Sequence, residues 1–148
     1  MPVSLKNLLK TGQLVDHETD AAQVRRMLEA IRQNIGDARS GSVSAETRFE
    51  AAYRAIIQCA MIALWANGYR PSKSVSGHHM TLIQMLPNSI GLDVDEMRLL
   101  DTFRVKRNAI DYSGEAVDGE SLRVCIDSAD RLLKRLQQWL SAHRSDLV

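Results

Sequence analysis

The sequence predicts an all-α protein that folds as a single compact bundle of about five helices. Apolar residues recur at intervals of three and four along most of the chain, capping residues precede these stretches, and strand patterns are few. With 148 residues, 45% hydrophobic and 25% charged, the chain can bury one core and has an ordinary globular composition. We therefore expect residues 1–148 to form one domain.

The first part of the chain predicts a short helix and two long ones. Ser4–Lys10 is expected to form one or two helical turns. The first long helix begins near Asp20, where Gln23 completes a capping box. The second long helix covers Ala45–Asn67, with Ser44 as its N-cap. Each of these helices is therefore marked by a capping residue as well as by its apolar spacing.

The remaining sequence predicts three more helices. A short helix opens after Ser76-Gly77 and ends before Pro87. The next covers Asp93–Tyr112, with Glu96 completing a second capping box. The last begins near Asp118. It carries a sustained amphipathic stripe made of Leu122, Cys125, Ile126, Ala129, Leu132, Leu133, Leu136 and Leu140.

The second long helix is the most apolar part of the chain. Between Ala51 and Ala66 only Arg54 and Gln58 are clearly polar, which is typical of a helix in the middle of a bundle or at an oligomer interface. We expect a homodimer, because this helix and the last predicted helix carry more apolar surface than a small bundle can bury. The most apolar stretch, Ala55–Ala66, is interrupted by Gln58 and is too short to span a bilayer, and Pro2–Asp16 lacks the apolar core of a signal peptide. These features predict a soluble, cytoplasmic protein that does not engage a membrane.

Composition and motifs exclude several familiar functions. The net charge of +1 gives no global basic field, so any nucleic-acid binding has to come from a local patch. The sequence has no phosphate-binding glycine loop, dinucleotide fingerprint or zinc-spaced cysteine pair, and we expect neither a metal nor a cofactor. Cys59 and Cys125 both fall on apolar helix faces, which predicts buried, reduced thiols.

Arg107 interrupts the apolar side of the predicted helix Asp93–Tyr112, a side that consists of Met97, Leu99, Leu100, Phe103 and Ile110. At about 100° per residue it projects between Leu100 and Phe103. A guanidinium on an apolar stripe is costly unless it is paired or has a function. Three polar residues lie on the adjoining flank: Arg104, Asn108 and Asp111. The group is either a functional site or an internal network in which Arg107 and Asp111, at i and i+4, form an ion pair.

A second candidate region is the segment that contains no acidic residue, Ala51–Leu92. It includes the loop Gly68–His79, whose cationic and imidazole side chains are Arg70, Lys73, His78 and His79. Two interpretations remain open for this loop: an anion site, or a solvated loop beside a helix with no room for acids. The adjacent histidines point about 100° apart and cannot ligate one metal together, so each is either structural or a general acid or base.

The order of these features resembles a known family. Arg107-Asn108-x-x-Asp111-Tyr112 late in a bundle helix, followed by a long amphipathic helix, resembles the HEPN superfamily. So do Ser4–Leu14 and the helix start at Gly77-His78-His79. That superfamily comprises small all-helical bundles, often dimeric, found in bacterial toxin–antitoxin and defence gene pairs. The resemblance therefore implies a HEPN-like fold.

The resemblance also implies roles for individual residues. Active HEPN ribonucleases carry an Arg–polar pair and, after a short gap, a histidine, and residues of both protomers converge on the scissile phosphate without metal. The Arg maps onto Arg107 and its polar partner onto Asn108, while Tyr112 occupies the histidine position. Tyrosine, with a pKa of about 10, is a poor base at neutral pH. These three residues form the expected catalytic set. The expected ligand-binding residues are Arg104, Asp111, Arg70, Lys73, His78 and His79.

Two functions follow as hypotheses from the resemblance. In the first, the protein is a component of a bacterial toxin–antitoxin or defence pair that interacts with RNA or nucleotides and cleaves RNA without metal. In the second, it is a non-catalytic module that binds a partner, such as the product of an adjacent nucleotidyltransferase-type gene. Loss of RNA cleavage on changing Arg107 favours the first, and a stable complex with the neighbouring gene product favours the second.

Overall fold

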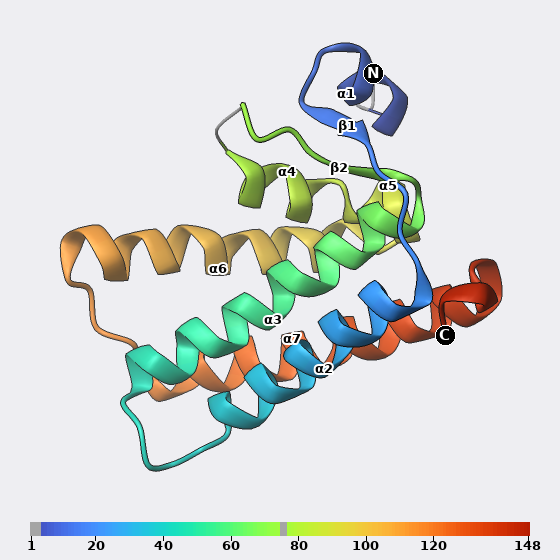
Figure 1. The fold of residues 1–148 in the computed structure, drawn as a ribbon. Helices are drawn as coiled ribbons and strands as arrows, with labels where there is room; N and C mark the ends of the chain where they lie inside the picture. The colour runs from blue at the N-terminus through green and yellow to red at the C-terminus, as the bar shows by residue number, and fades with distance from the viewer. Residues whose placement is uncertain (1–3, 75–76) are drawn as a thin grey trace.

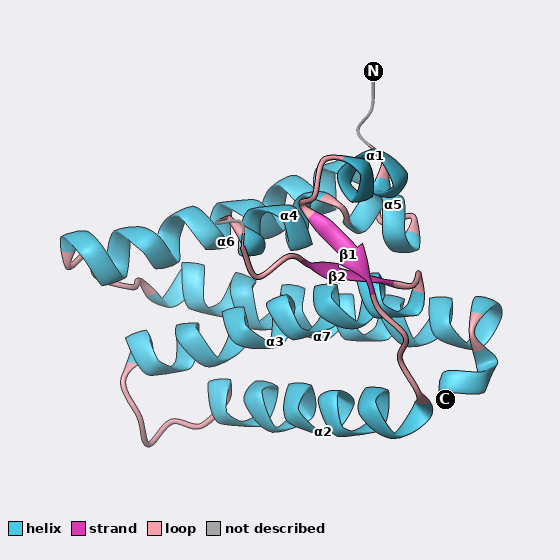
Figure 2. Cartoon of the chain, turned by 45° about the horizontal axis from the view of Figure 1, so that its top comes forward, coloured by secondary structure: helices cyan, strands magenta, loops and turns pink. Residues whose placement is uncertain are grey.

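The computed structural model describes residues 4–74 and 77–148 and confirms the all-α bundle (Figures 1 and 2). The helices are α1 (Leu5–Lys10), α2 (Ala21–Ala38), α3 (Ala45–Ala66), α4 (His78–Gln84), α5 (Leu86–Ile90), α6 (Val94–Ser113) and α7 (Gly119–His143). A single 3-10 turn, η1 (Ser145–Leu147), follows α7. The predictions that concern Pro2 and Ser76 lie outside the described residues.

Helix α3 is the central element of the bundle. It packs against α2 and α7 and also contacts α4 and α6, so that twelve of its 22 residues are buried (Figure 1). The predicted place of this helix in the middle of the bundle is therefore confirmed. It is the helix in the described part of the chain that is long and apolar enough to cross a membrane, but 67% of that apolar window is buried, as in the core helix of a soluble protein.

The amphipathic stripe predicted for the last helix is confirmed in α7. The eight residues of the predicted stripe, from Leu122 to Leu140, are all buried in the core. Cys59 of α3 and Cys125 of α7 are both buried, free thiols, as predicted. Burial raises the pKa of both thiols, that of Cys125 to about 12, so neither is a reactive thiolate at neutral pH.

Most of the predicted helix caps form, with one exception. Backbone amides at the start of α2, α3 and α7 donate to the side chains of Asp20, Ser44 and Asp118. The capping box predicted at Asp93 is wrong, because the Asp93 side chain makes no capping hydrogen bond. Its proposed partner Glu96 instead accepts a hydrogen bond from Arg131 of α7 at 3.1 Å. A tertiary ion pair has replaced the local one.

Two short elements differ from the prediction. Strands β1 (Leu14–Asp16) and β2 (Tyr69–Pro71) form an antiparallel pair with Leu14 opposite Pro71 (Figure 2). Strands of three residues are too short to show an alternating pattern in the sequence. The short helix α4 ends before Pro87 as predicted, but Pro87 then lies in the first turn of the separate helix α5. Proline is tolerated in the first turn because the backbone amides of that turn have no acceptor within the helix, so the missing N–H of proline removes no hydrogen bond.

Candidate functional site

Helix α6 carries Arg107 along one edge of the bundle. It ends at Gly114, whose φ of 65° places it in the left-handed region that favours glycine. Of the apolar residues predicted to face the core, only Leu100 and Phe103 are buried, while Met97, Leu99 and Ile110 are partly buried. The α6 stripe is therefore shallower than predicted, and the Arg107 side chain retains 28% of its exposure.

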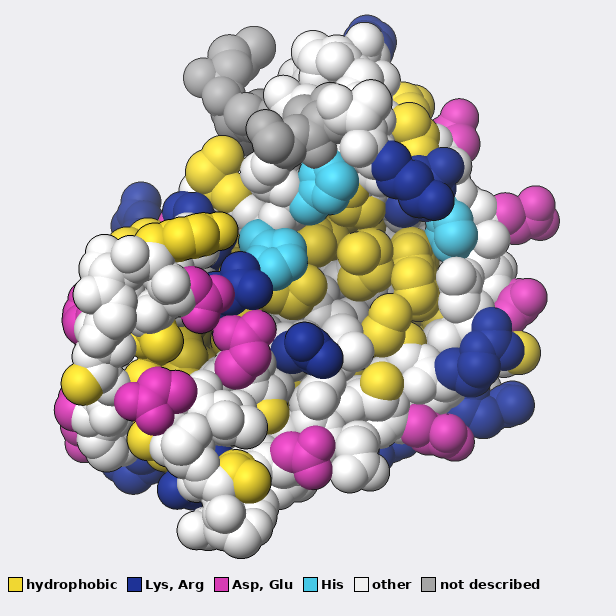
Figure 3. Space-filling model, turned by 60° about the vertical axis from the view of Figure 1, so that its left-hand side comes forward, with side chains coloured by type: hydrophobic (Ala, Val, Ile, Leu, Met, Phe, Trp, Pro, Cys, Tyr) yellow, Lys and Arg dark blue, Asp and Glu magenta, His cyan; other side chains and the backbone are white. Residues whose placement is uncertain are grey.

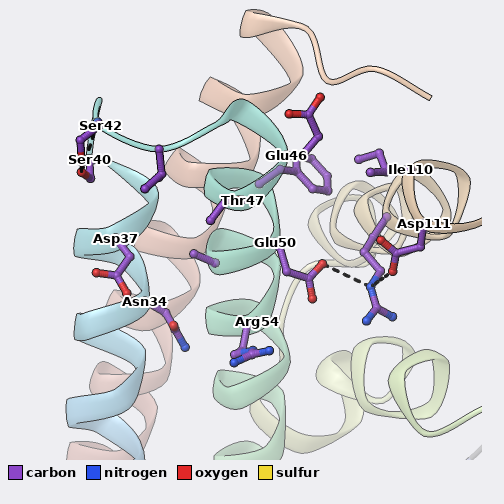
Figure 4. Close-up of a pocket in the computed structure, with 14 residues that line it drawn as sticks. Asn34, Asp37, Ser40, Ser42, Glu46, Thr47, Glu50, Arg54, Ile110 and Asp111 are labelled. Atoms are coloured by element: carbon purple, nitrogen blue, oxygen red, sulfur yellow. Dashed lines mark hydrogen bonds and ion pairs between the residues drawn. The ribbon is translucent and has the colours of Figure 1, made fainter. Parts of the chain in front are cut away.

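Arg107 is shared between two carboxylates from different helices. Its Nε donates a hydrogen bond to Oε2 of Glu50 on α3 at 3.3 Å and lies 3.0 Å from Oδ2 of Asp111 on α6 (Figure 4). Its guanidinium carbon also lies 5.7 Å from the centre of the Tyr53 ring. Partial burial lowers the pKa of Arg107, but Glu50 and Asp111 outweigh it and the net pKa shift is upward. The i,i+4 ion pair expected from the internal-network interpretation is confirmed.

These contacts leave part of the guanidinium available. The hydrogen bond to Glu50 and the ion pair with Asp111 both use Nε of Arg107. Within residues 4–74 and 77–148, neither of its terminal amino groups donates a hydrogen bond. Pairing therefore fixes the orientation of Arg107 without occupying the two groups that bind oxyanions best.

A pocket of about 310 Å³ places the two histidines of α4 beside the arginines of α6. It is lined by Gly77, His78, His79, Met80, Arg104, Arg107 and Asn108, and we call it the basic pocket. On this face of the molecule, histidine side chains lie next to arginine, lysine and acidic side chains (Figure 3). The histidines and arginines are separated by more than 20 positions in the sequence, and only the packing of α4 on α6 brings them together.

His79 is held in this pocket by a buried tyrosine. Its Nδ1 lies 2.9 Å from the hydroxyl oxygen of Tyr53 on α3, whose side chain is sealed in the core at 1% exposure. Burial lowers the pKa of His79, and the neighbouring Arg107 lowers it further. Burial also raises the pKa of Tyr53 far above its usual value, so the phenol keeps its proton at physiological pH. His79 is therefore a neutral imidazole near pH 7.

Two further basic residues of the pocket, Arg104 and His78, differ in their hydrogen bonding. Arg104 forms a bidentate pair with Asp101, at 2.8 Å from Nε and 3.2 Å from Nη2, and this hydrogen bonding raises its pKa. The Nε2 atom of His78 is buried and has no hydrogen-bond partner among the described residues. A buried ring nitrogen without a partner costs free energy, about 1–3 kcal/mol. Among the residues that line the basic pocket, His78 thus has a buried, unsatisfied ring nitrogen and Arg107 has unbonded donors.

Four predicted residues lie outside the basic pocket: Tyr112, Lys73, Arg70 and Asp111. Tyr112, mapped onto the histidine position of the motif, is 84% exposed and does not line the pocket. Lys73 is exposed, and Arg70 donates to the carbonyl of Pro71 at 3.3 Å. The helix turn explains the position of Tyr112, because five residues after Arg107 is about 500° of rotation and places the two side chains on different faces.

The predicted ligand-binding residue Asp111 borders a second, larger pocket of about 810 Å³ on the other side of Arg107. Figure 4 shows this pocket between the α2–α3 connection and α6. Its charged lining consists of Asp37, Glu46, Glu50, Asp111, Arg54 and Arg107. Acids outnumber arginines there, so the second pocket is less suited to an anion than the basic pocket.

Two residues of the site were missed by the sequence interpretation, namely Glu50 and Tyr53. Both lie on α3, one turn apart, and meet Arg107 and His79 across the bundle. One signal was present: Glu50 is the acidic residue immediately before the acid-free segment. Its distance of 57 positions from Arg107 gave no indication that the two would pair.

The described residues contain no group of three or more His, Cys, Asp or Glu side chains arranged to hold a metal ion. Comparisons of the chain with family models, with curated proteins and with solved structures gave no match.

Proposed function

We propose that this protein is a HEPN-like component of a bacterial toxin–antitoxin or defence gene pair that acts on RNA or nucleotides in the cytoplasm. The basic pocket binds a phosphate group of that ligand. The observation that carries the proposal is the convergence of His78 and His79 from α4 with Arg104, Arg107 and Asn108 from α6 around one pocket. These side chains are donors suited to phosphate oxygens.

The geometry favours recognition by directed hydrogen bonds over attraction by net charge. Glu50 and Asp111 offset the charge of Arg107, and Asp101 offsets that of Arg104. The unbonded terminal amino groups of Arg107 still provide a planar pair of donors. We therefore expect the affinity to depend only weakly on salt. A plot of the logarithm of the binding constant against the logarithm of the salt concentration should have a slope of about −0.7, the value for one phosphate contact with a single strand.

Binding is tested by titrating the protein against a labelled short RNA and against a nucleoside triphosphate at several salt concentrations. Wild type should bind at low salt, and Arg107→Met should weaken binding at least about tenfold, the loss expected for a charged hydrogen bond. The matched control is Arg98→Met, which removes a 71% exposed arginine of the same helix that pairs only with Asp95 among the described residues. Equal binding by wild type and Arg107→Met would refute the proposed site.

The resemblance further implies metal-independent RNA cleavage. Tyr112 lies outside the basic pocket, so within that pocket His79 is the residue on which cleavage beside Arg107 is expected to depend. The assay is incubation of labelled RNA with the protein in the presence of a chelator. Cleavage that disappears in His79→Gln and persists in Tyr112→Phe would assign the activity to this pocket.

A second candidate function is a non-catalytic module that binds a partner, such as the product of an adjacent nucleotidyltransferase-type gene. A specific observation favours a protein interface: Val105 and Tyr112, seven residues apart on α6, are 56% and 84% exposed. Residues at that spacing share one helix face. The same face is our proposed homodimer contact. Co-expression with the neighbouring gene product, followed by purification of a stable heterocomplex, would support the partner-binding function.

A further inference from the structure

We infer that Tyr53 fixes the tautomer of His79, so that the neutral ring carries its proton on Nε2 and presents a hydrogen-bond donor to the basic pocket. The ring assignment stands on the geometry of the free protein. Its consequence for ligand binding rests on the proposed function, because it predicts that His79 contacts a ligand oxygen as a donor. Tyr53 is then a positioning residue for the pocket.

The Tyr53 hydroxyl determines which nitrogen of His79 carries the proton. It has one proton to donate, it is buried with its side chain at 1% exposure, and its hydrogen-bond partner in the described structure is Nδ1 of His79 at 2.9 Å. If Nδ1 carried the proton, the hydroxyl would accept from it and its own proton would have no acceptor. An unsatisfied buried donor is costly. The arrangement that satisfies both groups has the hydroxyl donating to an unprotonated Nδ1.

The protonation of the second ring nitrogen, Nε2, follows from this arrangement. A neutral imidazole carries one proton, so an unprotonated Nδ1 requires Nε2–H. His79 lines the basic pocket, and its Nε2 is neither hydrogen-bonded within the described residues nor sealed from solvent. The Nε2–H group therefore belongs to a residue that lines the same pocket as Arg107, whose terminal amino groups are unbonded among the described residues. The pocket offers donors from both residues to one oxyanion.

This tautomer also limits the chemistry of the pocket. A general base at Nε2 needs a lone pair on that atom, and in this arrangement the only lone pair of the ring is on Nδ1, held by Tyr53. Protonation at Nδ1 would turn the Tyr53 hydroxyl away from its acceptor, which agrees with the lowered pKa of His79. In its resting state His79 therefore binds a ligand oxygen and does not abstract a proton.

Long-range proton–nitrogen NMR of nitrogen-labelled protein tests the inference, since it distinguishes the protonated from the unprotonated nitrogen of each imidazole. Spectra are recorded at a pH of about 8, where histidines are neutral, and the His79 signals are assigned by their loss in His79→Gln. Wild type should show a protonated Nε2 and an unprotonated Nδ1. Tyr53→Phe should shift His79 towards a mixture of both tautomers and weaken binding of a short RNA about three- to tenfold, the effect of one hydrogen bond.

The outcomes separate this inference from the proposed function. A wild-type His79 with its proton on Nδ1 would overturn the inference, whether or not RNA binds. The expected tautomer in a protein that binds no RNA would support the role of Tyr53 and refute the proposed function. The wild-type spectrum decides the tautomer by itself, so the test stands even if Tyr53→Phe does not fold.

Discussion

At the scale of single residues, the partial exposure of Arg107 and its partners determines how much their ion pairs contribute to stability. The side chains of Arg107, Glu50 and Asp111 are 28%, 36% and 43% exposed. Solvent screens such pairs, and exposed ion pairs contribute about 0–1 kcal/mol each. The geometry of Arg107 is well defined, but its electrostatic contribution to folding is small.

We therefore predict that Arg107→Met folds with a nearly unchanged melting temperature, because its aliphatic stem is replaced and little pairing energy is lost. A double-mutant cycle between Arg107→Ala and Asp111→Ala, measured by urea unfolding, should give a coupling below about 1 kcal/mol. A coupling of about 3–5 kcal/mol, as for a broken buried pair, would show that the network exists for stability.

The lowered pKa of His79 predicts a pH dependence of folding. Because the folded pKa lies below the unfolded value, the unfolded chain takes up a proton that the folded protein resists. The free energy of unfolding should therefore fall as pH drops from about 7.5 to about 5.5. The groups that face His79 are Arg107, Arg104, Glu50 and His78. In His79→Gln, urea unfolding at the two pH values should show a smaller fall, and an equal fall in both proteins would contradict this origin.

At the scale of secondary-structure elements, the helices differ in what stabilises their ends. The N-terminus of α3 is capped locally, since the amide of Thr47 donates to the Ser44 hydroxyl at 3.2 Å. That of α6 has no side-chain cap, and Glu96 in its first turn binds Arg131 of α7 instead. Local capping fixes where α3 begins, whereas a tertiary contact holds the start of α6.

This difference predicts unequal effects for two alanine substitutions. Ser44→Ala removes a formed cap and should lower the free energy of unfolding by about 1 kcal/mol. Asp93→Ala serves as the matched control at the start of α6 and should change it by less than about 0.5 kcal/mol, because no capping hydrogen bond is lost. Denaturant unfolding of both variants gives the comparison, and equal losses would mean that Asp93 caps α6 in solution.

At the scale of the whole molecule, most of the apolar surface that suggested a dimer is buried within one chain. The apolar residues of α3 and α7 form the core of the single bundle. The large apolar residues that remain exposed on α6 are Val94, Val105 and Tyr112, which share one helix face, and an apolar patch of this kind is typical of a protein contact. Our homodimer proposal therefore now concerns α6 and not the two core helices.

Light scattering at micromolar concentration should give twice the chain mass of 16.6 kDa. Val105→Glu should shift the protein towards the monomer, because a carboxylate buried in an apolar contact is costly. Val43→Glu is the matched control, since Val43 is also 43% exposed but lies in the connection between α2 and α3 and not on α6. A monomeric wild type would refute the proposal, and dissociation by both variants would show that the effect is not specific to this face of α6.

The sequence by itself determined the fold class and the long helices of this protein. Apolar spacing and capping residues are local signals, and they located α2, α3, α6 and α7 within a few residues of their observed bounds. They also identified Arg107 as an unusual residue and the i,i+4 pair that it forms. Each of these features depends on neighbours within one or two helical turns.

Only the tertiary structure decided which residues share a site. Glu50 lies 57 positions from Arg107 and Tyr53 lies 26 positions from His79, and these contacts arise only when α3, α4 and α6 pack together. The same packing brought His78 and His79 to Arg107 and left Tyr112, at the motif's histidine position, exposed to solvent. A local sequence motif determines which residues share one face of a helix. It does not determine which other helices pack against that face, and these helices supply the partners.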